Sequence, residues 1–326
     1  QDRTGYKILG AHGTQNAILS GRHHQSGLKV DVPCVGDWVV IEDRPGQQQT
    51  IIQDILPRKS TFSRKVSGDS VDEQVVAANI DTDFLVSGLD YEFNERRIER
   101  YLTIAWDGGA TPVIVLNKMD MCENPEWFKQ RVEKIAPAVD IILTNGHEGV
   151  GIVSLASYCR VGETVTFLGS SGVGKSTLVN CLLGEKRMRT TDKHPDARFG
   201  RHTTSHRELL FTPDGGMIID TPGMREIQLF GDENTLGGVF SDIEMVAQNC
   251  KFRNCLHENE PFCAVREAVE KGDISQSRLN NYIKLKKELD YVVRKKMYSN
   301  KWEQRLRERQ FAKMCKRIKK NNKKQM

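Results

Sequence analysis

The sequence predicts a multidomain α/β protein with three parts: an N-terminal β-barrel, a central α/β domain and a C-terminal helical region. Short β-type runs without helical periodicity fill the first 65 residues, and strands alternate with helices from about residue 70. A Cys/His cluster followed by helical sequence appears after residue 236. At about 100–200 residues per domain, 326 residues accommodate two or three domains. The expected boundaries are 1–68, 69–235 and 236–326.

The barrel is expected from four β-type runs near the N-terminus. They read YKIL, NAILS, VGDWVVIE and TIIQDIL, and they are separated by Gly, Pro and polar turns. Short strands at this spacing favour a small closed or nearly closed barrel of about five strands. An OB-like fold is the expected type.

The central domain is expected because the pattern changes to strand, helix, strand. Between the runs DFLVSGL and PVIVLNK, the apolar residues fall at i, i+3, i+4 and i+7: Ile98, Tyr101, Leu102 and Ala105. Asn94 is placed to cap the start of this helix and Gly108–Gly109 to end it. Further apolar runs follow (VDIILT, TVTFLG, ELLF and GMIID), with helical stretches at 125–136 and after 174. Such alternation builds a mostly parallel sheet with helices on both faces.

A phosphate-binding loop is indicated directly after the strand TVTFL. The stretch GSSGVGKS matches G-x-x-x-x-G-K-[ST] and leads into a helix. Its glycines let backbone N–H groups surround the phosphates, while Lys175 is expected to reach the β- and γ-phosphates and Ser176 to ligate Mg²⁺. The alternative is a Gly/Ser turn that happens to precede Lys-Ser. The expected nucleotide-binding residues are Gly169, Ser170, Ser171, Gly172, Val173, Gly174, Lys175, Ser176 and Thr177.

Two further motifs are predicted to respond to the γ-phosphate. Asp220 ends the strand GMIID, where its carboxylate can hold the metal ion through water, and the Gly223 amide is expected to sense the γ-phosphate. Thr204 is the predicted switch threonine that closes on Mg²⁺, with Thr203 as the alternative. Because Asp-Thr-Pro-Gly also forms an ordinary turn, this interpretation depends on the phosphate loop.

A guanine-reading motif is predicted directly after the strand PVIVL. Its Asp120 can accept hydrogen bonds from N1–H and the amino group of guanine, whereas adenine has no matching donors. The pattern therefore favours GTP over ATP and disfavours an ATPase or a kinase. We expect Asn117 to tie the loops together, Lys118 to pack along the base, and Thr144–Gly146 to add backbone contacts. An exposed turn is the alternative. The motif residues are Asn117, Lys118, Met119 and Asp120.

The order of these motifs indicates a circular permutation. In ordinary GTPases the phosphate loop comes first and the guanine-reading motif last, but here 117–120 precedes 169–176. The same sheet can assemble from a different starting point because the termini of a domain often lie close together. The switch segments, at about 190–230, then lead straight into the C-terminal part.

A structural zinc site is predicted from the pattern Cys250-x4-Cys255-x-His257-x5-Cys263. Three thiolates and one imidazole within 14 residues suffice for a closed tetrahedral site, which leaves no open position for catalysis. Free buried thiols are the alternative. The chain lacks apolar runs of the about 18–20 residues that span a membrane, and it lacks an N-terminal export signal. We therefore expect a cytoplasmic protein whose cysteines are thiols or metal ligands.

Taken in order, these motifs resemble the circularly permuted GTPases of small ribosomal subunit biogenesis, the RsgA or YjeQ-type family. The resemblance covers nearly the whole length, through LPRKSTFSRK, QVVAANIDTDFLV, NKMD, GSSGVGKST, GRHTTS, DTPG and the Cys/His cluster. It implies an RNA-binding OB-fold, a GTPase core with Mg²⁺, and one structural Zn²⁺ per chain. It also implies GTP hydrolysis stimulated by the small (30S) subunit and binding to its rRNA; we further expect a monomer without a membrane partner.

The DxxG motif does not supply the usual catalytic residue in this chain. Ras-like enzymes place a Gln after the DxxG motif to orient water, but Met224 stands there in this chain. The resemblance points to His202 as a replacement; the alternative is an ordinary solvated loop histidine. If neither residue supports hydrolysis, the rival function is an RNA-binding assembly module in which GTP is only a bound ligand.

The net charge of the chain is unevenly divided. Its 48 Lys and Arg against 43 Asp and Glu give +5, but residues 281–326 hold 17 against 4. This tail therefore carries +13 and residues 1–280 carry −8. Its apolar residues lie at helical spacing and leave a basic opposite face: Phe311, Met314, Cys315 and Ile318. We expect contact with rRNA phosphates, with a solvated helix face as the alternative.

Overall fold

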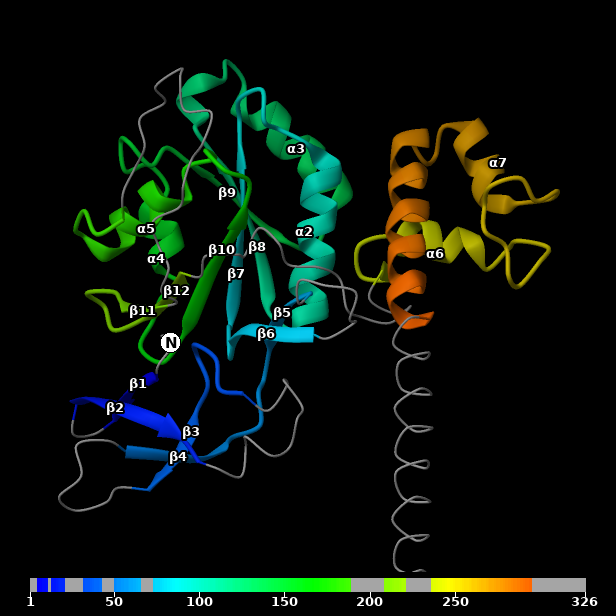
Figure 1. Cartoon of the computed structure of the whole chain (residues 1–326). Helices are drawn as coiled ribbons and strands as arrows, with labels where there is room; N and C mark the ends of the chain where they lie inside the picture. Colours follow the sequence, from blue (N-terminus) through cyan, green and yellow to red (C-terminus); the bar gives the residue numbers. More distant parts are fainter. Residues whose placement is uncertain are drawn as a thin grey trace, which may run out of the picture.

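Three parts are visible in the computed structural model (Figure 1): a small curled sheet, an α/β core and a helical region beside the core. The expected order of barrel, α/β domain and helical region is confirmed. The structure describes residues 5–10, 13–20, 32–42, 50–65, 73–188, 208–220 and 236–294.

Within the described residues, the N-terminal part is a four-stranded curled sheet, a half-barrel of the expected β type, and a closed barrel of five strands is not seen there. Its strand order is β1-β2-β4-β3, and the β2–β4 pair is parallel. A fifth strand, β5 (Thr61–Lys65), pairs instead with β6 (Glu73–Ala78). Because this pair lies on both sides of the 68/69 boundary, that boundary stays a prediction. The four strands are β1 (Tyr6–Gly10), β2 (Gly13–Leu19), β3 (Val39–Glu42) and β4 (Thr50–Ile55).

The core is a six-stranded sheet in the order β11-β12-β10-β7-β8-β9, parallel except for the β11–β12 pair. Counted from β10, the strand before the phosphate loop, the spatial order becomes 2-3-1-4-5-6. The chain therefore enters the sheet at its fourth strand, as the permuted motif order predicts. The strands are β7 (Thr82–Gly88), β8 (Thr111–Asn117), β9 (Asp140–Thr144), β10 (Thr164–Gly169), β11 (Glu208–Phe211) and β12 (Met217–Asp220).

Helices cover both faces of this sheet because its central strands are apolar on both faces. Leu85 of β7 belongs to the buried cluster that includes α2 (Glu95–Gly108) and α3 (Pro125–Ile135). Its neighbours Phe84 and Val86 belong to the opposite cluster, with α4 (Ile152–Ala156) and α5 (Lys175–Leu183). Successive side chains on a strand point to opposite faces, which accounts for this alternation.

Helix α2 follows the sequence prediction closely. The Asn94 side chain caps its start by accepting from the Arg97 amide, and Gly109 ends it with φ +80°. Ile98, Leu102 and Ala105 are buried, and Tyr101 is half-buried. The expected apolar face is therefore the face that packs on the sheet.

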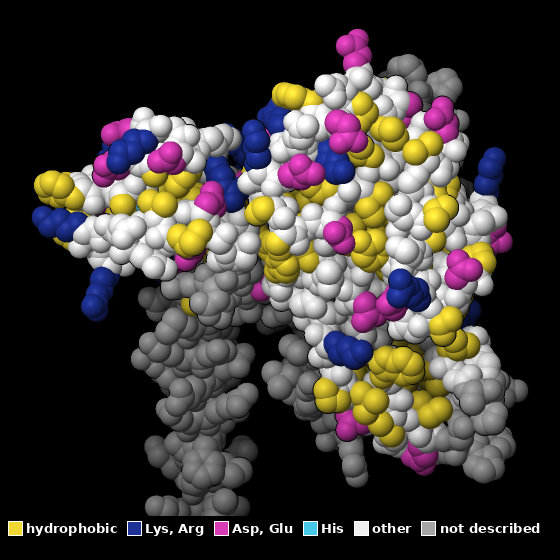
Figure 2. Space-filling model, turned by 180° about the vertical axis from the view of Figure 1, so that it is seen from behind, with side chains coloured by type: hydrophobic (Ala, Val, Ile, Leu, Met, Phe, Trp, Pro, Cys, Tyr) yellow, Lys and Arg dark blue, Asp and Glu magenta, His cyan; other side chains and the backbone are white. Residues whose placement is uncertain are grey.

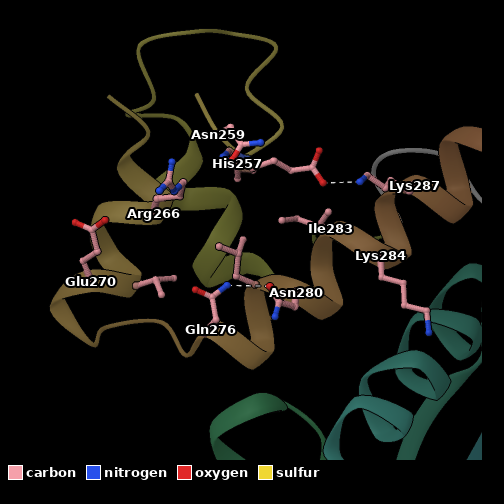
Figure 3. A pocket seen from close by; sticks show the side chains of 12 residues that line it. His257, Asn259, Arg266, Glu270, Gln276, Asn280, Ile283, Lys284 and Lys287 are labelled. Carbon is pink, nitrogen blue, oxygen red and sulfur yellow. Dashed lines mark hydrogen bonds and ion pairs between the residues drawn. The ribbon is translucent and has the colours of Figure 1, made fainter. Parts of the chain in front are cut away.

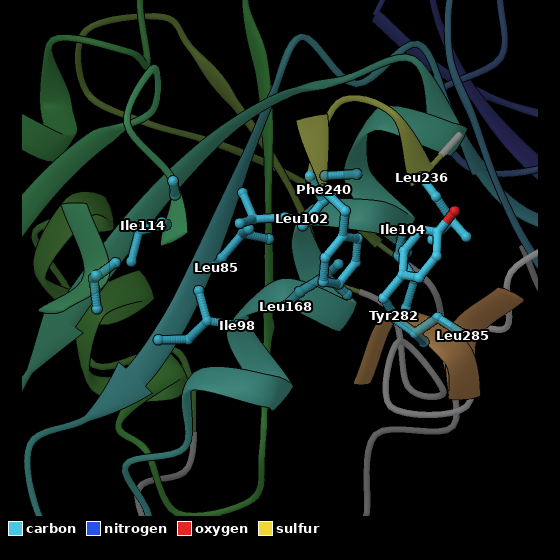
Figure 4. Packing of buried hydrophobic residues seen from close by; sticks show 14 of the residues in the cluster. Leu85, Ile98, Leu102, Ile104, Ile114, Leu168, Leu236, Phe240, Tyr282 and Leu285 are labelled. Carbon is cyan, nitrogen blue, oxygen red and sulfur yellow. The ribbon is translucent and has the colours of Figure 1, made fainter. Parts of the chain in front are cut away.

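The helical C-terminal region packs against α2 through a shared core. Its described residues form α6 (Ser241–Ala247), α7 (Ala264–Lys271) and a helix over 276–294, called the final helix because it is the last one among the described residues. Figure 4 shows Leu102 of α2 among the side chains of this core, together with Phe240 and Tyr282. Among the described residues, none of the helices combines the length and the apolar character needed to cross a membrane.

Candidate nucleotide site and metal centre

The nucleotide motifs lie at one edge of the sheet, where the parallel strands end. Gly88 at the end of β7 is in register with Asn117 at the end of β8, and Asn117 with Thr144 at the end of β9. The end of β10, Gly169, is in register with Val86. Loops at the carboxyl ends of neighbouring parallel strands form the usual ligand-binding crevice of open α/β sheets.

Asn117 connects three of the predicted segments. Its buried side chain donates from Nδ2 to the Val173 carbonyl of the phosphate loop at 2.8 Å. Its Oδ1 accepts from Thr144 Oγ1 at 3.0 Å and from the Gly146 amide at 3.2 Å. The side chain therefore uses both its donor and its acceptor. It joins the guanine-reading motif to the phosphate loop and to the segment Thr144–Gly146 at the end of β9, called the third loop.

The phosphate loop requires glycine next to this junction. Gly174 has φ +100°, and a Cβ at this position would lie 2.2 Å from Asn117 Nδ2. Helix α5 begins at the next residue, Lys175, so its N-terminal amides lie beside the loop and favour an anion. Lys175 Nζ donates to the carbonyl oxygens of Gly169 and Ser170, both at 2.7 Å. In this arrangement the Lys175 ammonium caps the loop.

The guanine-reading motif is shaped by Lys118. This residue has φ +64°, and its Nζ forms an ion pair with Asp90 Oδ2 at 2.7 Å. Asp120 follows in a short turn of 3-10 helix, η2 (Met119–Met121), where its side chain is exposed. Within the described residues, the Asp120 carboxylate has no hydrogen-bond or ion-pair partner, so its oxygens are available to accept from a base.

Asp220 lies at the end of β12, next in the sheet to the phosphate-loop strand. Burial raises its pKa, while the positive charge of Lys175 opposes part of this shift. The carboxylate and the ammonium therefore share one end of the sheet, as the sequence predicts. The remaining predicted residues lie outside the described residues: His202, Thr203, Thr204, Gly223, Met224 and the basic tail beyond 294.

The four predicted metal ligands converge. Cys250 Sγ lies 3.7 Å from His257 Nδ1 and 3.9 Å from Cys263 Sγ, and the last two atoms are 3.4 Å apart. With Cys255 included, all four ligand atoms lie within 4.8 Å of one another. A tetrahedral ion with Zn–S of about 2.3 Å and Zn–N of about 2.0–2.1 Å separates its ligand atoms by about 3.5–3.8 Å. The cluster therefore fits a closed four-ligand metal site.

The local backbone and charge of the cluster also suit a metal. His257 and Phe262 both have φ +60°, which turns the loop sharply around the cluster. Burial, and then the Lys286 cation, lower the pKa of His257. The imidazole is therefore neutral near pH 7, the form in which Nδ1 can ligate a metal.

Comparison with known proteins identifies the family. The sequence model of the RsgA GTPase family matches residues 55–230. The "Small ribosomal subunit biogenesis GTPase RsgA 1" of Oceanobacillus iheyensis is 42% identical over 292 residues, covering 89% of this chain and 83% of that protein. The chain belongs to the RsgA family of GTPases. It is thus an enzyme that hydrolyses GTP.

Other RsgA proteins and structures agree with this membership. The RsgA of Methanosarcina acetivorans is 42% identical over 321 residues, covering 98% of this chain and 85% of that protein. The crystal structure of YjeQ from Thermotoga maritima is 28% identical with a TM-score of 0.65, covering 88% of this chain and 95% of that one. YloQ, described as a circularly permuted GTPase, has a TM-score of 0.62 at 24% identity over 88% of this chain and 91% of that one, which supports the permuted fold.

Two residues that contact the RsgA motifs were not predicted from the sequence. Asp90 holds Lys118, and Arg97 contacts Ser170 of the phosphate loop. Both follow β7, whose end lies beside the phosphate loop. Their position in the chain could have indicated them, because segments that follow a parallel strand of this sheet begin at the ligand-binding crevice.

A polar groove lies beside the metal cluster of this RsgA protein. Its volume is about 730 Å³, and its walls come from α7, the final helix and the loop over residues 250–263 that carries the four candidate ligands, called the metal loop. Figure 3 shows Arg266 on the α7 wall and Ile283 and Lys284 on the final helix. Within the described part of the chain, neither Arg266 nor Lys284 has an ion-pair or hydrogen-bond partner, whereas Lys287 pairs with Glu258.

The metal loop also presents aromatic side chains to solvent. Phe262 is 75% exposed and Phe252 is 41% exposed, and Lys251 Nζ lies 4.4 Å and 5.9 Å from the centres of their rings. Figure 2 shows hydrophobic and basic side chains together at the end of the C-terminal region, while elsewhere on that face charges of both signs are interspersed. This end of the molecule combines the two side-chain types that contact single-stranded nucleic acid.

Proposed function

We propose that this RsgA-family GTPase acts in late maturation of the small (30S) ribosomal subunit, which stimulates its turnover and which it binds through rRNA. The names of its relatives support the biological process. The hydrogen bonds of Asn117, which join the guanine-reading motif, the phosphate loop and the third loop, carry the proposal for the site. We place the protein in the cytoplasm as a monomer.

In the proposed site, each segment has one task. The amides of Gly169–Thr177 and the Lys175 ammonium hold the phosphates, Asp120 accepts from the guanine base, and Ser176 and Thr204 ligate Mg²⁺. When bound, Mg²⁺ would supply positive charge that offsets the negative charge of the transferred phosphoryl group. Asp220 supports the metal through water, and Gly223 donates to the γ-phosphate. Water then displaces GDP from the γ-phosphoryl group, and His202 orients that water.

The C-terminal region is proposed as a second contact with the subunit. One Zn²⁺ held by the four ligands would fix the metal loop without taking part in chemistry. Arg266 and Lys284 in the groove, the aromatic residues of the metal loop and the basic tail would contact rRNA phosphates and bases. The half-barrel would add a further RNA contact.

The decisive experiment is GTP turnover of the full chain with and without purified small subunits. We expect a low rate alone and a large increase with subunits. His202→Ala should lose the increase and keep GTP binding; unchanged stimulation in this variant would remove His202 from the mechanism. An equally low rate under both conditions would instead favour the RNA-binding module in which GTP is only a ligand.

Base recognition is tested separately with Asp120→Asn. The change replaces one acceptor by a donor, so GTP loses hydrogen bonds to a charged group and its affinity should fall by about 10- to 100-fold. Xanthine carries a carbonyl where guanine carries the amino group, so binding of xanthosine triphosphate should improve. Equal GTP affinity in variant and wild type would exclude Asp120 as the base reader.

A further inference from the structure

Arg97, in the first turn of α2, contacts the phosphate loop from outside the motif. Its Nη1 donates to Ser170 Oγ at 2.6 Å and to Glu92 Oε2 at 3.1 Å. Ser170 is the second residue of the loop, and the motif G-x-x-x-x-G-K-[ST] leaves its identity open. A charge-assisted hydrogen bond therefore fixes a loop residue that the motif does not constrain.

Ser170 is held at two different atoms by two cations. The Lys175 ammonium binds its backbone carbonyl at 2.7 Å, while Arg97 binds its side-chain oxygen at 2.6 Å. When Lys175 turns toward a bound phosphate, it gives up at least part of its contact with the carbonyl. The Arg97 contact does not depend on that movement, because it reaches Ser170 from α2.

Helix α2 is a firm support for this contact. The Asn94 side chain caps its N-terminus through the backbone amide of Arg97 itself, at 3.3 Å. Leu102 and Ala105 lie fully buried against the sheet. The neighbouring Arg96 points elsewhere, since its Nε donates to Ser277 Oγ of the final helix at 3.0 Å. Only one of these two adjacent arginines therefore reaches the phosphate loop.

We propose that Arg97 is a positioning residue for nucleotide binding, which holds Ser170 and keeps the phosphate loop in its nucleotide-binding shape. The proposal rests on the proposed nucleotide-binding role of that loop. A loop ordered in advance does not have to be ordered at the moment of binding, so the benefit appears in affinity. It applies to GDP and GTP alike, because both place phosphates in the loop.

The test measures GDP and GTP affinity of the full chain by titration with fluorescent nucleotides. Arg97→Leu and Ser170→Ala should each weaken both nucleotides by about tenfold, as expected for loss of one hydrogen bond to a charged group. The double variant should be no weaker than either single variant, because both changes remove the same contact. Arg97→Lys should recover part of the affinity. In Arg97→Leu, the loss should appear in nucleotide affinity and in the KM for GTP rather than in the maximal rate of unstimulated turnover, because binding changes and chemistry does not.

Arg96→Leu is the matched control, since it removes the same charge from the same helical turn. It should leave nucleotide affinity within about twofold of wild type, as expected for an exposed contact away from the site. Ser170→Ala provides a second control, because it breaks the contact while leaving the charges of Arg97 and Glu92 in place.

Three outcomes would overturn the proposal. Weaker binding in Arg97→Leu but not in Ser170→Ala would assign the effect to charge alone. A lower maximal rate with unchanged affinity would place Arg97 in the chemistry. Unchanged affinity in both variants would leave the contact without a role. Lys175→Ala tests the proposed nucleotide site itself. If Lys175→Ala keeps full nucleotide affinity, the proposed site is wrong. If Lys175→Ala loses affinity while Arg97→Leu keeps it, only the role of Arg97 is refuted.

Discussion

The proposed nucleotide site and the candidate metal centre are ordered by different means. The nucleotide site is assembled at the ends of buried strands, where Asn117 and Gly174 are fixed by the sheet and by α5. The metal centre lies in a loop between two short helices, and its four ligands come from positions 250–263. The first site should therefore persist whenever the sheet is folded, whereas the second should depend on its own ligand cluster.

Helix α2 is the element that both regions contact. Its Arg97 reaches the phosphate loop, and its Glu99 is buried against Arg278 and Asn281 of the final helix. Arg278 also binds both carboxylate oxygens of Asp242 on α6, each at 2.8 Å. Different interactions therefore order the two regions, but α2 contacts both of them.

Loss of a metal ligand should produce the largest effect. Cys263→Ser, or removal of the metal by a chelator, should unfold the metal loop and α7, because structural zinc contributes about 10 kcal/mol or more to folding. Nucleotide affinity should change little if the sheet orders its site independently. Hydrogen exchange of residues 250–272 and a GDP titration measure the two responses. Cys122→Ser, which changes a half-buried thiol outside the cluster, is the control. Unchanged exchange on metal removal would contradict the assigned role of the cluster.

The second-largest effect should come from disrupting the ion pair between Glu99 of α2 and Arg278 of the final helix, called the joint between the two regions. Arg278→Met leaves the Glu99 carboxylate, 3% exposed, without its cation, which costs about 3–5 kcal/mol. Urea unfolding and hydrogen exchange should report weaker protection of the final helix and α2. Glu99→Leu combined with Arg278→Met should recover much of the loss, because no buried charge remains unpaired.

Arg100 supplies the control for this joint. It forms two 2.7 Å hydrogen bonds with Glu288, but both side chains are about 30% exposed. Arg100→Met should therefore cost at most about 1 kcal/mol. Equal losses for Arg278→Met and Arg100→Met would show that burial does not set the strength of the α2 contacts.

The sequence predicted what depends on local pattern. We could place α2 from its apolar spacing, the Asn94 cap and Gly109. The motifs likewise predicted that Asn117 and Val173 lie together and that the four metal ligands converge. The Glu99–Arg278 joint was not predictable, because its partners lie 179 positions apart and no local rule pairs them. Among the described strands the expected barrel is half closed, because β5 pairs with β6, and a strand's partner is set by tertiary packing rather than by its own sequence.

A buried carboxyl group should make the stability of the sheet region depend on pH. Asp83 of β7 is fully buried, and within the described residues neither of its oxygens has a hydrogen-bond partner of normal geometry. Burial raises its pKa well above the usual range, and the Leu168 amide offsets this only in part. The folded state therefore keeps a proton that the unfolded state loses above pH 4 or so.

The sign of this dependence follows from the raised pKa. Stability is highest below the unfolded pKa of about 3.9 and falls by about 1.4 kcal/mol per pH unit as pH rises toward the folded pKa. Asp83→Asn should remove this contribution to the slope above about pH 4, measured by urea unfolding at several pH values. An identical slope in variant and wild type would mean that Asp83 is ionised in the folded protein.

The smallest expected effect belongs to the groove, and it distinguishes an RNA contact from an ordinary charged surface. Arg266→Ala with Lys284→Ala removes two cations of the groove that have no partner within the described residues. If both neutralise rRNA phosphates, the slope of log affinity against log salt for the small subunit should fall by about 0.7–0.9 per cation.

Lys271→Ala is the control, because Lys271 is paired with Glu267 outside the groove and its loss should leave the slope unchanged. A reduced affinity with an unchanged slope would assign the groove to a contact with protein instead, since release of counterions from a nucleic acid is what produces the salt dependence. Nucleotide affinity should be unaffected in both variants, because the groove lies beside the candidate metal cluster and not at the nucleotide motifs.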